Sequence, residues 1–482
     1  DYYASRGLGD VYKRQIYINK DRLFSKRRCN MKKFTFIGAG SLDFTKDLVR
    51  DILTFEAFRD AELMLMDIDP KRLEYAVKGV QKIVDAGKYP AVVKGTQDRK
   101  EALKDADGVL ITILQGGVEV WRHDIEIPKK YNVDICVGDT RGPSGIFRFL
   151  RTAPVLLDII RDCEEVCPNA VVLNYTNPMA MLVSYLQSMS DMNITGLCHS
   201  VQGTAEMLAK WIGAEEKQVR YTCAGINHQA FYLDFEVDGK DAYPDLYKAI
   251  EREEVAAEEP VRIEMFKKLG YFNTESSGHN SEYVAWFRKR PDLIEKYCTH
   301  GTGWNPGAYG FILDEYLGRE DTWEKEYTDW LENGEVDLER GEEYASNIFN
   351  AVFGDHTPYF FNGNLKNHGY ITNVKQGVCV EVPTVATEAG IVPIKQITLP
   401  DHLAVLVNNS ALIEDLAVKA AIEGDPNLVF QAVLYDPLTS AVCSMDEILN
   451  MVQEMLDKNA EYLSYFKSLK INMEVLHEKE NR

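Results

Sequence analysis

Five short apolar runs mark the first 200 residues, and segments with helical spacing separate them. The runs cover 32–40, 61–69, 106–114, 170–176 and 192–198. Between them, 45–55, 70–87 and 148–166 place apolar residues three and four positions apart, as on one face of a helix. Strands that alternate with helices predict a parallel, doubly wound α/β sheet, which binds ligands at the carboxyl ends of its strands.

The regular alternation stops near residue 200, and the rest of the chain mixes both patterns. Residues 225–240 predict a strand and hairpin, 245–300 are mostly helical, and 401–470 form a long helical stretch. We therefore predict two domains, a doubly wound domain over 31–200 and an α+β domain over 201–482. The crevice between them is the natural place for a binding site.

The first thirty residues differ in composition from the rest. They contain eight Lys or Arg and three Asp, whereas the whole chain is acidic. They have neither the apolar core nor the small-residue cleavage site of a secretory signal peptide. We interpret 1–30 as a non-native or disordered leader, with the native start at Met31; an amphipathic targeting segment is the alternative.

The composition argues against two classes of partner, nucleic acids and membranes. The formal net charge of -21 argues against nucleic acid, which is bound through clustered Lys and Arg. No stretch reaches the roughly 18 consecutive apolar residues of a membrane span, so we expect no membrane partner. The nine cysteines have irregular spacing, which indicates reduced thiols and a cytoplasmic protein. A small molecule is the partner class that remains.

The turn after the first strand carries part of a dinucleotide-binding fingerprint. The sequence GAGS supplies the first two glycines, although Asp43 stands at the third glycine position. A carboxylate at the end of the next strand suits ribose hydroxyls and would repel the extra phosphate of NADP. The pattern predicts a Rossmann-type domain that binds NAD; a generic α/β domain with a tight turn is the alternative. The predicted cofactor-binding residues are Gly38, Gly40, Ser41, Asp67 and Thr112.

Two further segments place polar groups near the predicted crevice. Residues 138–148 are too rich in Gly and Pro for a helix interior and predict a loop that offers Asp139, Thr140 and Arg141; a surface turn is the alternative. Asn177 precedes Pro178, which holds it out of a helix. Its amide can bind a ligand hydroxyl or cap the turn. We predict that Asp139, Arg141 and Asn177 contact the substrate.

Cys198 and His228 form a candidate metal site. Cys198 ends the last predicted strand, and His228 follows thirty positions later between two polar residues. A thiolate and an imidazole can hold a divalent ion, and two protein ligands leave positions open for substrate oxygens. These donors suit zinc well, and manganese or another ion less obviously. Packing of both side chains in a core is the alternative.

The segment 275–291 gathers Glu275, His279, Glu282 and Tyr283. In a helix, His279 and Tyr283 would share one face. A tyrosine near a metal can act as a general base when its pKa is depressed. A tyrosine that packs its ring and hydrogen-bonds its hydroxyl is the alternative.

Several motifs, taken in order, closely resemble glycoside hydrolase family 4, from about Met31 to residue 470. They are FIGAGSLDF, LMDID, GDTRGPSG, NYTNPMA, CHSVQG, GINHQAF, the SEY segment and NHGYITNVKQGVCVEVP. The resemblance implies a Rossmann-type domain related to lactate and malate dehydrogenases, with a second α+β domain. It also implies NAD, a divalent ion such as Mn²⁺, reducing conditions, and a homodimer or homotetramer.

The resemblance also implies roles for single residues. Cys198 and His228 would bind the metal, Asp67 the adenosine ribose, and Asn177 the sugar hydroxyls. Tyr283, the last residue of the SEY segment at 281–283, is the candidate base.

His199, directly after the metal cysteine, is the candidate acid. The family mechanism removes a hydride from C3 of the sugar onto NAD, then the C2 proton, then the aglycone by elimination. Water adds and the hydride returns, so the net reaction is hydrolysis.

The sequence CHSV at 198–201 is the version associated with α-galactosidases. Related CHE and CHG forms accompany α-glucosidases and α-glucuronidases, and phospho-glycosidases carry Cys-Asn or Cys-Asp followed by Pro. We predict an α-galactosidase that acts on small galactosides such as melibiose, with the α-glucosidase and α-glucuronidase activities as alternatives. An NAD-dependent dehydrogenase is the alternative from another class.

Two sets of residues would extend the sugar site. Asn364, Asn367 and His368 lie in an aromatic and amide-rich stretch and could line a carbohydrate pocket. Arg141, Arg148 and Arg288 could form an anion pocket, which would suit a uronic acid.

Overall fold

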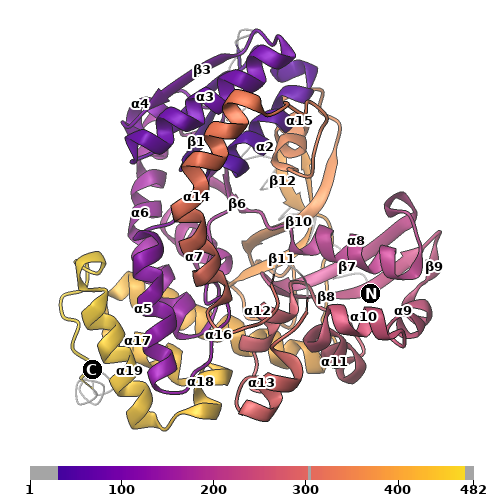
Figure 1. The fold of residues 1–482 in the computed structure, drawn as a ribbon, viewed down its shortest axis with the longest axis vertical. Coiled ribbons are helices and arrows are strands. Elements are labelled where there is room, and N and C mark those ends of the chain that lie inside the picture. Colours follow the sequence, from indigo (N-terminus) through magenta and orange to yellow (C-terminus); the bar gives the residue numbers. More distant parts are fainter. Residues whose placement is uncertain (1–30, 302–304, 473–482) are drawn as a thin grey trace, which may run out of the picture.

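The computed structural model describes residues 31–301 and 305–472, and its first part is a parallel sheet with helices on both faces (Figure 1). The strands lie in the order β3-β2-β1-β4-β5-β6. They are β1 (Lys33–Ile37), β2 (Glu62–Met66), β3 (Val92–Thr96), β4 (Gly108–Ile111), β5 (Val171–Asn174) and β6 (Asn193–Gly196). This confirms the predicted Rossmann-type sheet. The predicted leader, 1–30, lies outside the described residues.

Helices cover both faces of this sheet, so its strands are buried on both sides and read as continuous apolar runs. One face packs against α2 (Leu42–Thr54) and α3 (Pro70–Gly87). The other packs against α5 (Gly117–Lys130), α6 (Gly142–Val166) and α7 (Met179–Met189). The turns at the strand ends are thereby held from two sides.

The loop predicted over 138–148 is shorter than expected, because α6 already begins at Gly142. Pro143 lies in the first turn of α6, where the missing N–H needs no partner. Gly142 has a φ of 66°. The prediction over Gly142–Arg148 was therefore wrong, and the helix carries Arg148 toward the strand ends.

The second part of the chain extends the same sheet. Strand β8 (Gln229–Val237) lies in the segment predicted over 225–240, and its hairpin partner β7 (Val219–Ile226) begins before that segment. The order continues from β6 as β10-β11-β7-β8-β9. The other strands are β9 (Lys240–Asp241), β10 (Tyr359–Lys366), β11 (Cys379–Thr387) and β12 (Gly390–Pro393), which pairs with β11.

Single residue pairs join the two parts of the sheet. Asn364 of β10 pairs with Gly196 of β6, and Glu381 of β11 pairs with Gly225 of β7. Cys198 follows the first of these pairs by two positions, and His228 follows the second by three. The two candidate metal ligands therefore leave from one continuous sheet.

The helical stretch predicted at the C-terminal end is present and packs on the first part of the chain. Its helices share a core cluster with α5, α6 and α7. They are α16 (Asp401–Glu423), α17 (Pro426–Leu434), α18 (Pro437–Val442) and α19 (Met445–Lys458). The chain thus returns to its first half, and the domain boundary at residue 200 stays a prediction. The remaining α-helices are α4 (Arg99–Leu103), α8 (Ser200–Ile212), α9 (Tyr243–Ala249), α10 (Glu253–Glu258), α11 (Pro260–Leu269), α12 (Ser277–Glu282), α13 (Pro291–Tyr297) and α15 (Ala345–Phe353).

Helix α14 (Phe311–Asn333) comes from the second half and runs along the first half, between α3 and α5 (Figure 1). Only Leu313 and Tyr327 of this helix are buried. Ion pairs tie it to the start of α3, from Lys71 to Glu324 at 2.6 Å and from Arg72 to Glu320 at 2.9 Å. These polar contacts add to the packing of Leu313 and Tyr327 in the two hydrophobic cores.

No helix among residues 31–301 and 305–472 is long and apolar enough to cross a membrane. The cysteines that this part of the chain contains are all free thiols.

A buried ion pair joins α5, α6 and the end of α19. Arg151 and Asp124 are fully buried, and Arg151 also donates to Asn459 Oδ1 at 3.0 Å. We expect Asp124→Asn to lower the free energy of unfolding by about 3 kcal/mol, because it leaves a buried guanidinium without its counter-charge. Denaturant unfolding followed by tryptophan fluorescence measures this. Glu74→Gln, which removes the exposed Lys78 pair, is the control and should change little. Equal shifts in both variants would contradict the prediction.

Candidate functional site

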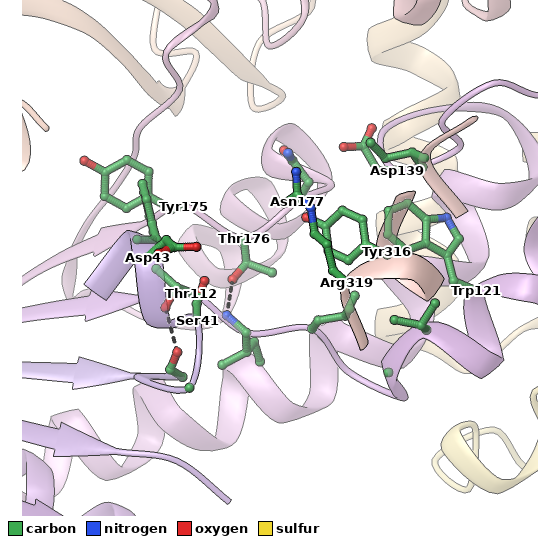
Figure 2. A pocket seen from close by; sticks show the side chains of 18 of the residues that line it. Ser41, Asp43, Thr112, Trp121, Asp139, Tyr175, Thr176, Asn177, Tyr316 and Arg319 are labelled. Atoms are coloured by element: carbon green, nitrogen blue, oxygen red, sulfur yellow. Dashed lines mark hydrogen bonds between the residues drawn. The ribbon is translucent and has the colours of Figure 1, made fainter. Parts of the chain in front are cut away.

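A cleft of about 2360 Å³ lies along the carboxyl ends of the parallel strands. Most of the residues predicted from sequence line it: Gly38, Gly40, Ser41, Asp67, Thr112, Asp139, Asn177, Cys198, His199 and His228. Arg141 and Tyr283 do not line it. Figure 2 shows Ser41 and Thr112 with Asn177, Asp139 and Trp121 around this pocket.

Two positions in the turn between β1 and α2 have no room for a side chain. Gly38 has a φ of 88°, and a Cβ there would lie 2.5 Å from the Thr112 carbonyl oxygen. The Gly40 N–H donates to Asp67 Oδ2 at 2.7 Å, and a Cβ on Gly40 would lie 2.6 Å from that oxygen. Thr112 Oγ1 donates to the Gly38 carbonyl at 3.0 Å (Figure 2). A bare backbone at a helix N-terminus is suited to a phosphate group, so this turn fits a dinucleotide.

Helix α14 forms the opposite wall. Tyr316 and Arg319 project from it into the pocket (Figure 2). Farther along, Trp323 lies under Arg72, with the guanidinium carbon 4.4 Å from the ring centroid. The dinucleotide turn therefore faces a wall from the second half of the chain.

Cys198, His228 and Glu275 form a cluster whose ligand atoms all lie within 4.8 Å of one another. Glu275 Oε2 lies 3.4 Å from His228 Nε2. His228 and Glu275 have φ angles of 62° and 70°, which non-glycine residues rarely adopt. Such backbone strain is concentrated at functional sites.

The protonation states of the cluster suit a metal. Burial lowers the pKa of His228 to about 4, which leaves a neutral imidazole. Burial alone would raise the pKa of Glu275, but the charge and hydrogen bond of His279 outweigh it and hold that pKa below its usual range. Burial raises the pKa of the Cys198 thiol to about 12, so a bound cation would displace its proton. A thiolate, an imidazole and a carboxylate together fit a divalent ion.

A second grouping, Asp139, His228 and His279, also lies within 4.8 Å. Both nitrogens of His279 already have partners, however. Nδ1 lies 2.8 Å from Ser276 Oγ and 3.1 Å from Glu275 Oε1, and Nε2 lies 3.5 Å from Asp139 Oδ1. Burial opposes the charge on His279, but the two carboxylates raise its pKa well above its usual range. A protonated imidazole is no ligand, so the cluster with Cys198 is the better site.

Tyr283 and Thr140 both lie behind His228. The Thr140 hydroxyl is 2.9 Å and the Tyr283 hydroxyl 3.3 Å from His228 Nδ1, which leaves Nε2 for the cluster. Tyr283 is 1% exposed, and burial raises its pKa well above the usual range. The Arg141 guanidinium lies 4.7 Å from the Tyr283 ring centroid and pairs with Glu414 at 3.0 Å.

His199 lies at the edge of the cleft, with 44% of its side chain exposed. Its ring stacks on Tyr175 at 5.7 Å. Nε2 lies 3.0 Å from Glu343 Oε2, and Nδ1 has no partner among the described residues. Burial lowers the pKa of His199, but the hydrogen bond and charge of Glu343 outweigh this and raise it overall. His199 can therefore hold a proton.

Asn177 caps its own turn and also lines the cleft. Its Oδ1 accepts the Met179 N–H at 3.2 Å, which caps the turn. Its Nδ2 has no partner in the described part of the chain and is available to the cleft.

Other expected sugar contacts lie elsewhere. Asn364 and Asn367 are 0% exposed and make internal hydrogen bonds, and His368 does not line the cleft. Arg288 is fully buried against Asp134. With Arg141 paired to Glu414, the expected anion pocket of three arginines is not formed. Only Arg148 of the three lines the cleft.

The sequence matches the Family 4 glycosyl hydrolase profile over residues 33–214 and the Family 4 glycosyl hydrolase C-terminal domain over residues 223–439. The chain belongs to this family. Family 4 relatives include an α-galactosidase of Rhizobium meliloti, 38% identical over 90% of this chain and 89% of its own length. An α-galactosidase of Bacillus subtilis is also 38% identical, over 91% of this chain and all of its own.

Solved structures share the family fold. A 6-phospho-α-glucosidase from gut microorganisms, in complex with NAD and Mn²⁺, superposes with a TM-score of 0.75 at 19% identity. The superposition covers 92% of this chain and 100% of that one. The two profile matches confirm the resemblance to family 4 stated from the motifs.

Proposed function

We propose that this family 4 protein is an NAD- and divalent-metal-dependent α-galactosidase that hydrolyses small, non-phosphorylated galactosides. The observation that carries the proposal is one cleft with a dinucleotide turn on one side and the Cys198, His228 and Glu275 cluster on the other. The two α-galactosidases at 38% identity support the choice of sugar, as does CHSV at 198–201.

The cofactor would be NAD. Gly38, Gly40 and Ser41 would hold its phosphates, and Asp67 would bind its ribose. Thr112 lies beside Gly38 and would complete the site. Asp67 already accepts the Gly40 N–H through Oδ2, which fixes the carboxylate at the end of β2. When bound, NAD would take a hydride from the sugar, while a divalent ion would stabilise negative charge on the neighbouring oxygen.

Cys198 and His228 are the proposed metal ligands, as expected from the resemblance, and we add Glu275 as a third. Mn²⁺ is the proposed ion, supported by the carboxylate in this set. Glu275 Oε2 lies 3.4 Å from His228 Nε2, so a cation bound by His228 would also be within reach of this carboxylate.

His199 is the proposed acid. The carboxylate of Glu343 favours the protonated imidazole, and the free Nδ1 would deliver the proton to the leaving oxygen. Asn177 Nδ2 and the Asp139 carboxylate would bind sugar hydroxyls from the cleft wall.

The role of Tyr283 as base stays a prediction. Its burial behind His228 supports a different proposal more directly, in which Tyr283 and Thr140 orient the ligand imidazole. Arg141 then acts on Tyr283 rather than on the sugar. The cytoplasmic location and the homodimer or homotetramer also remain proposals.

A panel of nitrophenyl α-galactoside, α-glucoside, α-glucuronide and phosphorylated glycosides, with and without NAD, Mn²⁺ and thiol, tests the function. We expect the α-galactoside to be cleaved fastest, with at least about a 100-fold loss when NAD is stripped, because the general base step needs the oxidised sugar.

Full activity without NAD would refute the mechanism. Faster cleavage of another glycoside would replace the sugar and keep the reaction. Stoichiometric NADH without aglycone release would identify a dehydrogenase instead.

A further inference from the structure

The cleft contains one guanidinium that forms no ion pair with a carboxylate of the described residues. Arg72, Arg99, Arg122, Arg262 and Arg319 also line the cleft, and each forms an ion pair with an Asp or Glu. Arg148 of α6 has no such partner within 31–301 and 305–472. Arg148 is therefore the cleft arginine whose positive charge is available to a ligand.

Arg148 is held in place along one side only. Its Nε donates to the Asn177 carbonyl at 3.1 Å, and its guanidinium carbon lies 4.5 Å from the Trp121 ring centroid. Nη1 is buried without a hydrogen-bond partner in the described part of the chain. A buried donor without a partner is unfavourable, and a ligand oxygen would supply the missing acceptor. The Arg148 side chain is therefore held in position and has a donor left for a ligand.

The neighbours of Arg148 place it at the sugar end of the cleft. Its Nε donates to the carbonyl of Asn177, and the Asn177 and Asp139 side chains line the same pocket (Figure 2). Asp139 in turn lies 3.5 Å from His279, beside the proposed metal ligands. Both Arg148 and Asp139 line the cleft, and no ion pair joins these two described residues. The phosphates of a dinucleotide would instead lie at Gly38 to Ser41.

We propose that Arg148 binds oxygen atoms of the sugar opposite Asp139 and so determines which sugars the cleft accepts. This inference rests on the proposed function. The guanidinium donates to two neighbouring oxygens, while Asp139 accepts from a hydroxyl group. Paired donor and acceptor groups of this kind recognise vicinal diols. A hydroxyl pair and a C6 carboxylate both present such oxygens.

The test measures ligand affinity apart from turnover, in protein loaded with NAD and Mn²⁺. The variants are Arg148→Gln and Arg148→Lys, and the control is Arg122→Gln, which removes a cleft arginine that is already paired. Trp121 gives a fluorescence signal beside Arg148, and calorimetry confirms it. We expect Arg148→Gln to weaken galactose binding about 30-fold, since charged hydrogen bonds contribute that much. Arg148→Lys should recover part of this, and the affinity for NAD should stay within about 3-fold.

Galacturonate, measured in parallel, identifies the oxygens. A larger loss for galacturonate than for galactose assigns the carboxylate to Arg148, and equal losses assign hydroxyl groups; both support contact with the sugar. Unchanged galactose affinity in Arg148→Gln, or an equal loss for NAD, overturns the proposal. If the unaltered protein binds no galactose, the proposed function itself fails.

Discussion

Replacing Cys198 by serine should weaken Mn²⁺ binding by at least about 100-fold and remove most of the glycosidase activity, because a serine hydroxyl does not ionise at neutral pH. Cys198 lies in the cluster with His228 and Glu275, so its loss leaves two ligands. Titration of Mn²⁺ followed by electron paramagnetic resonance measures the affinity without substrate. Nitrophenyl α-galactoside gives the activity.

Two further variants sharpen this experiment. Cys443→Ser removes a thiol far from the cluster and should bind Mn²⁺ normally. Glu275→Gln keeps the shape of the side chain and removes its charge, and we expect roughly a 10-fold loss of affinity, in the range seen when groups around a metal are altered. Normal Mn²⁺ binding in Cys198→Ser would rule out the ligand assignment.

Tyr283→Phe should lower Mn²⁺ affinity about 10- to 100-fold, because the imidazole of His228 loses an orienting partner. Saturating Mn²⁺ should then restore most of the activity and of the deuterium exchange at C2 of the sugar. The two readouts are the Mn²⁺ titration and mass spectrometry of product formed in deuterium oxide.

The matched control is Tyr465→Phe, which also removes a tyrosine hydrogen bond, to the Leu150 carbonyl at 2.8 Å. It should leave both readouts unchanged. If exchange at C2 stays lost in Tyr283→Phe at saturating Mn²⁺, the tyrosine is the base that the sequence predicted, and it moves from its place behind His228 when substrate binds.

The dinucleotide side of the site was predictable from the sequence because local rules govern it. Gly38 and Gly40 follow a buried strand directly, and the end of β2 must lie beside them in a parallel sheet. The same rule brings Thr112, Asn177 and Cys198 to one edge. These residues needed no knowledge of distant contacts.

The metal side was less predictable because it depends on contacts between distant segments. Glu275 reaches His228 through left-handed backbone at both residues, and nothing in their residue types predicts those angles. Glu343 meets His199 across 144 positions. The burial of Tyr283 likewise follows from its packing, which its place in the SEY segment does not predict.

The way the sheet continues from β6 through β10 and β11 to β7 limits how the enzyme can open. In a protein of two hinged lobes, ligands often enter when the lobes swing apart. Here such a swing would pull Cys198 away from His228 and break backbone pairing at Gly196 and Gly225. We therefore expect Cys198 and His228 to keep their relative positions when ligands enter and leave. Sugar and cofactor would instead enter beside α14, which two partly exposed ion pairs and side chains packed on both cores hold in place.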